Sequence, residues 1–122
     1  MLDRIDNPLN FQAQALKLRA QRAELLAGNI ANADTPGYKA VDMDFAKALA
    51  AATSQAARGN AAASRDAAPK VEERPAVKAS LDGNTVDLDT ERVNFADNAL
   101  RYEATLRFIN GKLKTYLSAI QG

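Results

Sequence analysis

Carboxylates are the side chains of this sequence that could do chemistry. The chain of 122 residues contains no cysteine and no histidine, which excludes disulfides, thiolate metal ligands and the commonest general base. Asp42 and Asp44 alternate along a predicted strand, so both would lie on one face, as paired catalytic carboxylates do. The sequence offers no partner base, phosphate-binding loop or metal-ligand spacing beside them. A solvated strand face explains the pair better, and we predict neither catalytic residues nor an enzyme.

A second acidic group lies in the segment Asp82-Gly83-Asn84-Thr85-Val86-Asp87-Leu88-Asp89-Thr90-Glu91. This spacing invites a calcium site, but an EF-hand loop needs its glycine at the sixth position and a ligand at the fifth. Here the glycine is second and the fifth residue is valine. A turn followed by a helix cap explains the same residues, and we predict no metal site and no cofactor. The turn and cap residues are Asp82, Gly83, Asn84, Asp87 and Asp89.

The charge distribution excludes several classes of partner. Sixteen basic and 15 acidic residues are interspersed and give a net charge of +1, so we expect no surface suited to nucleic acid or anionic lipid. No apolar stretch approaches the roughly 20 residues that cross a bilayer. Residues 1–6 lack the basic start and apolar run of a signal peptide. We therefore expect no membrane insertion, and these features alone indicate a cytoplasmic protein.

The first part of the chain predicts a long helix from roughly Pro8 to Ala33. Asn7 can cap this helix, and Pro8 suits its first position. Its apolar residues cover so much of the circumference that the helix should be buried on more than one side. With 122 residues and 6% aromatic side chains the chain can build only a thin core. We expect the second side of the helix to pack against another molecule.

A second long helix is predicted from about Leu88 to Ile120, and its apolar residues recur in unbroken steps of four and three. This spacing is the a/d seam of a coiled coil. The seam could belong to a core within the chain, or it could also be shared with other subunits. The second interpretation is favoured, because the ordering entropy leaves an isolated helical hairpin little margin. The predicted seam residues are Phe95, Ala99, Tyr102, Leu106, Ile109, Leu113, Tyr116 and Ile120, with Phe11, Leu18, Leu25 and Ile30 from the first helix.

The expected fold is mainly α, with a small irregular or β middle segment. Residues 1–36 and 88–122 should pair as one axial coiled-coil domain, and residues 37–87 should form a variable middle. Within the middle, alternating apolar residues predict strands at Val41–Phe45 and Val77–Leu81, which could pair. Residues 45–52 are rich in alanine and could form a short helix. Residues 53–76 are of low complexity and predict a flexible, Ala-rich loop.

The junction after the first helix is more specific than a helix end requires. A single glycine or asparagine followed by proline would be enough. Pro36 forbids a continued helix, and Gly37 permits a positive φ. The three Asn and Asp side chains before them can bond to local backbone. The full junction reads Asn29-Ile30-Ala31-Asn32-Ala33-Asp34-Thr35-Pro36-Gly37-Tyr38-Lys39.

This junction, between two terminal helices and a variable middle, resembles that of the axial proteins of the bacterial flagellum. The family's rod signature is similar to residues 26–39, with Asn29, Ile30, Ala31, Asn32, Thr35, Pro36, Gly37, Tyr38 and Lys39 as its motif positions. The opening run at residues 11–22 and the segment at residues 82–91 are similar to those of the proximal rod subunit in particular. The resemblance covers roughly residues 1–50 and 77–122, and the short, alanine-rich middle departs from it.

The resemblance implies a structural subunit of the flagellar basal-body rod, the shaft that transmits torque from the motor to the hook across the periplasm. Its partners would be other rod proteins and copies of itself in a helical assembly. It would leave the cytoplasm unfolded through the flagellar type III export apparatus, without a cleaved signal peptide. Two alternatives stay open: a different rod subunit of the same family, or a soluble coiled-coil adaptor or secretion chaperone that forms a closed dimer.

Overall fold

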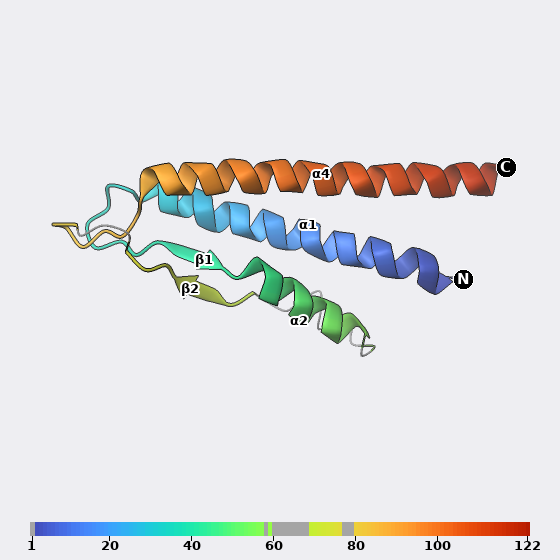
Figure 1. Ribbon diagram of the computed structural model, residues 1–122, viewed down its shortest axis with the longest axis horizontal. Helices are drawn as coiled ribbons and strands as arrows, with labels where there is room; N and C mark the ends of the chain where they lie inside the picture. The colour runs from blue at the N-terminus through green and yellow to red at the C-terminus, as the bar shows by residue number, and fades with distance from the viewer. Residues whose placement is uncertain (1, 58, 60–68, 77–79) are drawn as a thin grey trace.

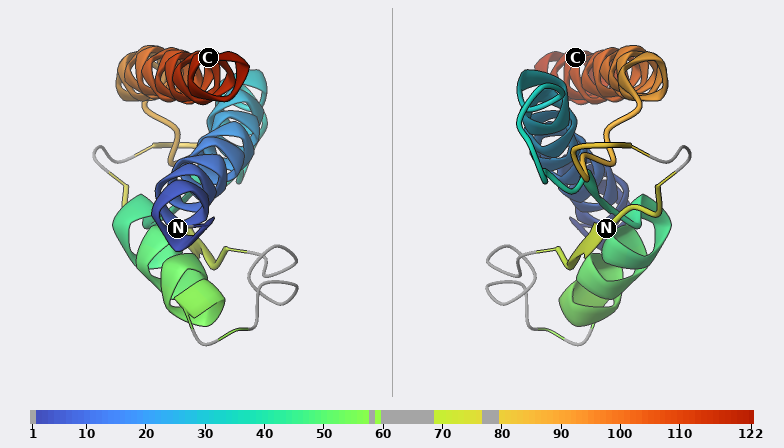
Figure 2. Two further views of the ribbon diagram at one scale, coloured as in Figure 1. Left: turned by 90° about the vertical axis from the view of Figure 1, so that its right-hand side faces the viewer. Right: turned by 90° about the vertical axis from the view of Figure 1, so that its left-hand side faces the viewer.

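The computed structural model describes residues 2–57, 59, 69–76 and 80–122. Within them, α1 (Leu2–Ala31) lies between the long helix α4 (Leu88–Gln121) on one side and the short helix α2 (Phe45–Ala57) on the other (Figures 1 and 2). The strands β1 (Val41–Met43) and β2 (Val71–Glu73) form an antiparallel pair on the same side of α1 as α2 (Figure 1). This arrangement confirms the predicted mainly α fold with paired terminal helices.

Helix α1 begins earlier than predicted and ends earlier. It starts at Leu2, so Pro8 lies inside it rather than at its first position, and the predicted cap at Asn7 is wrong. A proline there removes one backbone hydrogen bond, to the carbonyl of residue 4, and the chain continues as helix on its N-terminal side. The other end tightens: the amide of Asn32 bonds to the carbonyl oxygens of Gly28 and Asn29, and the helix stops at Ala31.

The middle segment pairs differently from the prediction. The partner of β1 is β2, with Val41 opposite Glu73 and Met43 opposite Val71. Of the predicted partner, Val77–Leu81, residues 77–79 lie outside the described residues, and Leu81 lies in a turn. All three side chains of β2 are exposed, so this strand carries no apolar alternation that a sequence pattern could detect.

Two further corrections concern the segment around α2. The predicted strand at residues 41–45 stops at Met43, because Asp44 caps α2: its Oδ1 accepts a hydrogen bond from the amide of Lys47 at 3.1 Å. The short alanine-rich helix is confirmed and continues to Ala57. The predicted loop at residues 53–76 is therefore shortened at both ends, by α2 and by β2.

Helix α4 matches its prediction within one residue at its C-terminal end, and Asp87 is its N-cap, with Oδ1 accepting from the amide of Thr90 at 3.4 Å. Its packing differs from that of α1. Among the described residues, the buried side chains of α4 are polar, Glu91 and Asn98. The buried apolar core lies instead in α1, the residues around β1, and α2: it comprises Ala15, Leu18, Leu26, Ala40, Met43 and Ala52.

Candidate functional site

Asn29 connects the end of α1 to β1 and α4. Its side chain is fully buried and bonds to both backbone groups of Val41: Nδ2 donates to the carbonyl oxygen at 2.7 Å, and Oδ1 accepts from the amide at 3.0 Å. Nδ2 also donates to Oε2 of Glu91 at 3.0 Å, and the hydroxyl of Tyr38 donates to Oδ1 at 3.4 Å. The side-chain amide of Asn29 therefore pairs with the backbone of Val41 as a neighbouring β-strand would. This pairing fixes the position at which the chain turns back after α1.

Asn84, in the segment before α4, binds the turn that follows α1. Its Nδ2 lies 2.8–2.9 Å from the carbonyl oxygens of Asn32, Ala33 and Thr35, and its Oδ1 accepts from the amide of Val86 at 2.8 Å. These three residues follow Ala31, the last residue of α1, so Asn84 stabilises the turn after the helix. This contact joins two segments that are far apart in the sequence.

Two glycines allow the turn after α1 and the turn before α4 to contact each other. Gly37 and Gly83 both have φ of +75°, a region that L side chains rarely occupy. The amide of Gly37 donates to the carbonyl oxygen of Asp82 at 2.8 Å, and Nζ of Lys39 donates to that of Gly83 at 2.7 Å. Thr85 makes two hydrogen bonds with the residues just before β1. Its amide donates to the carbonyl oxygen of Tyr38, and its hydroxyl accepts from the amide of Ala40. We name this unit, residues 29–43 with 82–91, the junction end.

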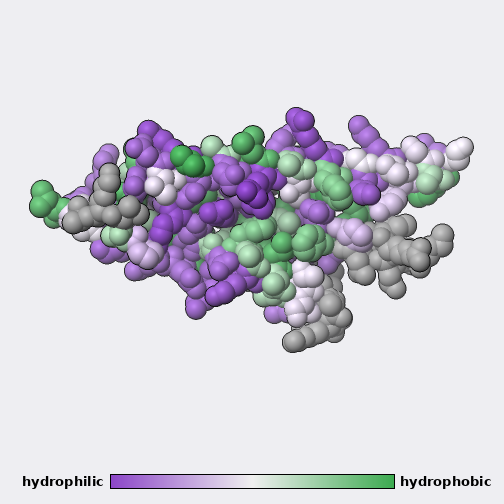
Figure 3. Space-filling view, in the orientation of Figure 1, coloured by the Kyte–Doolittle hydropathy of each residue, from purple (hydrophilic) through white to green (hydrophobic). Residues whose placement is uncertain are grey.

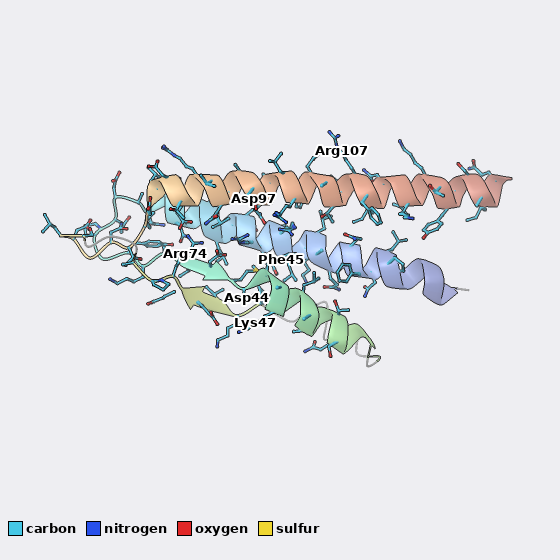
Figure 4. All side chains as sticks on the ribbon, viewed as in Figure 1. Asp44, Phe45, Lys47, Arg74, Asp97 and Arg107 are labelled. Carbon is cyan, nitrogen blue, oxygen red and sulfur yellow. The ribbon has the colours of Figure 1, made fainter. Side chains whose placement is uncertain are left out.

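An ionic network stabilises the junction end. Nε and Nη2 of Arg22 lie 3.0 and 3.1 Å from the two carboxylate oxygens of Asp42. Arg74, just after β2 (Figure 4), forms ion pairs with both Asp42 and the buried Glu91. The two positive and two negative charges compensate one another, as buried charges require. Burial alone would raise the pKa of Asp42, but hydrogen bonds from Arg22, from the Met43 amide and from Arg74 lower it below its usual value.

The contact between α1 and α4 is also polar. Nδ2 of Asn98 donates to the carbonyl oxygen of Arg19 at 2.9 Å, and the Arg19 guanidinium lies 3.9 Å from the centre of the Phe45 ring (Figure 4). Burial, then the positive charges of Arg101 and Arg22, lower the pKa of Arg19. Asn98 and Glu91 lie about two turns apart on one face of α4. The partly buried seam residues Tyr102 and Ile109 continue this α1-facing side of α4 toward its C-terminal end.

The predicted seam is only partly covered within the single chain. Phe95, Leu113 and Ile120 are exposed to 38, 45 and 81%. From Asn110 onward, every residue of α4 except Tyr116 is exposed, because α1 and α4 diverge toward their far ends (Figure 1). Of the other predicted seam residues, Ala99 and Phe11 are exposed, Leu18 is buried, and the partly exposed ones are Tyr102, Leu106, Ile109, Tyr116, Leu25 and Ile30.

This exposed apolar surface continues beyond the predicted seam. Val93, Leu100 and Leu117 are exposed to more than half of their area, and apolar side chains reach the surface near the end of α4 (Figure 3). A helix that is apolar on several sides is normally buried among other helices. We name the part of α4 from Asn110 onward the open end. Chemically, it can bind the apolar faces of other helices.

Acidic residues of the predicted turn have structural partners. A hydrogen bond from the Ser80 hydroxyl, with others from backbone amides, lowers the pKa of Asp82. Within the part of the chain that the structure describes, acidic side chains do not gather into a group that could hold a metal ion. In the same part, α1 and α4 are too polar to cross a bilayer, and α2 is too short.

Several residues that form or contact the junction end were not predicted from the sequence. Arg74 lies in the stretch that predicted a loop, and Arg22 belongs to the polar arc of α1. Glu91 and Asn98 were not recognised as buried, although polar residues at a seven-residue spacing beside an apolar seam are a detectable signal. The sequence does not reveal which residues pair, because the partners are far apart along the chain: Arg74 is 17 residues from Glu91 and 32 from Asp42.

Comparison with known proteins identifies the family. A family model described as flagella basal body rod protein matches residues 9–39, which contain the whole Asn29–Lys39 junction. The chain is 45% identical to the flagellar basal body rod protein FlgB of Salmonella typhimurium, over 100% of this chain and 99% of the relative. It is 45% identical to FlgB of Escherichia coli (strain K12), over 99% and 98%, and 43% identical to FlgB of Cereibacter sphaeroides, over 93% and 94%. The chain therefore belongs to the FlgB family of flagellar basal body rod proteins.

Proposed function

We propose that this chain is a structural subunit of the flagellar basal-body rod, and that the open end of α4 packs among the helices of neighbouring subunits. The observation that carries the proposal is the exposed apolar surface of α4, with Leu113, Leu117 and Ile120 uncovered. Burying a side chain of this size contributes about 1.5–3 kcal/mol. Contacts with copies of itself and with other rod proteins would supply that burial, and a contact that does not close on itself generates a helical assembly.

The division of the chain supports a mechanical role for each part. Residues 1–36 and 88–122 would form the axial coiled-coil domain, and residues 37–87 would project from it toward other subunits. The junction end joins α1, α4, β1 and β2 through buried hydrogen bonds and ion pairs. Such a joint resists changes in the angle between its elements. A rod built from these subunits would transmit torque from the motor to the hook without bending at each subunit.

The same proposal includes the route of assembly. Rod proteins of this kind would pass unfolded through the flagellar type III export apparatus, without a cleaved signal peptide, and act in the periplasmic part of the basal body. A chain whose core consists of a few small and medium side chains is suited to this route, because it gains its remaining burial only on assembly. We assign the chain to the proximal rod rather than to another subunit such as FlgC, because its full-length relatives are FlgB proteins.

The experiment that tests the proposal places a charge in the exposed seam. Leu113→Asp or Leu106→Asp should abolish rod assembly and swimming while leaving the amount of protein in the cell unchanged, because burying an unpaired carboxylate between helices is unfavourable. Leu113→Met, which preserves size and polarity, is the matched control and should swim normally. Normal motility of the Leu113→Asp strain would refute the proposed role of the seam.

The alternative function, a soluble coiled-coil adaptor or secretion chaperone, predicts a different oligomeric state. A closed coiled-coil dimer would cover the open end in solution, so the purified chain would sediment as a stable dimer and would be absent from isolated hook–basal bodies. The rod proposal predicts the chain among the proteins of hook–basal bodies stripped of their filaments, and basal bodies without a rod when the gene is deleted.

A further inference from the structure

One leucine next to the junction end, Leu81, is not covered by any of the residues that the structure describes. Leu81 is exposed to 111% of its reference area, at the tip of the turn Ser80–Gly83, in which the amide of Gly83 bonds to the carbonyl oxygen of Ser80. Oδ1 of Asp82 accepts from the amide of Asn84 at 3.0 Å, and the carbonyl oxygen of Gly83 accepts from Lys39 at 2.7 Å. The turn therefore presents Leu81 in a fixed position rather than on a freely moving loop.

A groove of about 320 Å³ lies between α1 and α2, where apolar side chains gather in the middle of the molecule (Figure 3). Its apolar lining comes mainly from Leu18, Ala48, Ala51 and Ala52. The volume is at the low end of the range for ligand pockets, roughly 300–1,000 Å³. It suits one branched side chain with its turn rather than a whole helix.

The polar groups of this groove lack partners that an incoming turn would supply. Oε1 of Gln21 and Oε1 of Gln55 are buried and accept no hydrogen bond in the described part of the chain. Buried acceptors without donors are rare in proteins and are energetically unfavourable. Both glutamines line the groove, as does Gln14, which is also buried. Backbone amides of a bound turn are donors of the kind that these acceptors need.

The rim of the groove is basic. Lys17 and Lys47 have no ion-pair partner among the described residues, whereas Lys70 pairs with Glu72 at 3.6 Å. The remaining acid, Asp44, caps α2, and Figure 4 shows it beside Lys47 at the start of that helix. An occupant that combines an apolar side chain with a carboxylate would complement this rim. The turn at the junction end has that composition.

We propose that the Ser80–Gly83 turn of one copy docks into the α1–α2 groove of a second copy, with Leu81 in the groove and Asp82 at the lysine rim. The turn and the groove are different surfaces of the molecule (Figure 1). Such a contact is heterologous, so each subunit offers both a turn and a groove to its neighbours, and the contact extends an open lattice. This inference rests on the proposed rod function and adds a specific lateral contact between copies.

Cysteine cross-linking in assembled rods tests the contact, because the natural chain has no cysteine. The double variant Leu81→Cys/Ala51→Cys should replace the natural chain in the bacterium, and isolated hook–basal bodies should be oxidised and separated without reductant. We expect covalent dimers and larger species of this chain. The controls are Leu81→Cys alone, Ala51→Cys alone and Leu100→Cys/Ala51→Cys, which should give at least tenfold fewer dimers.

The outcomes separate this contact from the function on which it rests. Both substituted residues are exposed, so the fold should be kept; if the double variant still assembles poorly, the two single variants are produced in one cell, and a mixed dimer is expected. Rods that assemble and swim but yield only monomer after oxidation would overturn the contact and leave the rod function standing. Absence of the chain from hook–basal bodies would instead overturn the rod function.

Discussion

The junction end and the open end of the molecule differ in whether contacts within the single chain satisfy their side chains. At the junction end, the buried side chains of Asn29, Asn84 and Glu91 all have hydrogen-bond partners within the chain. At the open end, Leu113 and Ile120 are exposed on a helix from which α1 diverges. Directional polar contacts fix the geometry of one subunit, whereas apolar surface is non-directional and can join subunits. The comparison predicts that mutations at the two ends act on different quantities.

The largest expected effect on the folded monomer comes from Asn29→Ala. It leaves the amide and carbonyl of Val41 unpaired and removes a donor from the buried carboxylate of Glu91. We expect the free energy of unfolding, measured by urea titration, to fall by about 3 kcal/mol. Asn110→Ala, an exposed change in α4, is the matched control and should stay within about 0.5 kcal/mol. Equal free energies of unfolding for Asn29→Ala and Asn110→Ala would contradict the claim that buried hydrogen bonds at the junction end stabilise the single chain.

Asn84→Ala should have the next largest effect. Its side-chain amide is the shared donor for three carbonyl groups in the turn after α1, and some of these groups can bind water when the donor is lost. We expect a loss of about 1–2 kcal/mol in the free energy of unfolding. Asn84→Asp keeps the shape and the acceptor but removes the donors, so it should be at least as destabilising. A neutral Asn84→Asp would show that packing, not hydrogen bonding, holds the turn.

Acidification should weaken the junction end through Asp42. The pKa of this carboxyl group is lower in the folded chain than in the unfolded chain, where it is about 3.9. The folded state therefore binds fewer protons, so its ion pairs stabilise it above pH 4, and this contribution is lost as the pH falls through the lower folded pKa. Asp42→Asn should be less stable at pH 7 and should show a smaller decrease between pH 5 and pH 2. Parallel pH profiles of the two proteins would contradict the role of this group.

The smallest effect on the monomer is expected at the open end. Leu113→Asp should change the free energy of unfolding by no more than about 0.5 kcal/mol, because the side chain is exposed in the single chain. The same substitution should abolish rod assembly. If Leu113→Asp destabilised the purified monomer as strongly as Asn29→Ala, the open end would already be packed within the chain, and the comparison would fail.

The sequence predicted the elements that local patterns define. Helix α4 was recognisable because its heptad spacing and the cap at Asp87 are both local signals. The turn after α1 was recognisable from Pro36 and Gly37. The position of β2 was not, because its exposed residues carry no alternation, and its place depends on Arg74 reaching Asp42 and Glu91 from a distant part of the chain.

The same reasoning explains why the candidate site was predicted only in part. The junction motif was singled out, but the role of Asn29 as the partner of Val41 requires the chain to have turned back. The heptad pattern predicted an apolar stripe on α4 but not the element or molecule against which the stripe packs. The rotation of α4 about its axis is set by two polar residues, Glu91 and Asn98, which bind the α1 side.

Hydrogen exchange of the purified chain and of isolated rods, compared amide by amide, tests the central claim most directly. We expect the amides of the junction end, residues 29–43 and 82–91, to be protected in both samples. We expect the amides of residues 110–121 to exchange rapidly in the free chain and to become protected in the rod. Equal protection of residues 110–121 in the free chain and in the rod would contradict the claim that neighbouring subunits complete the open end.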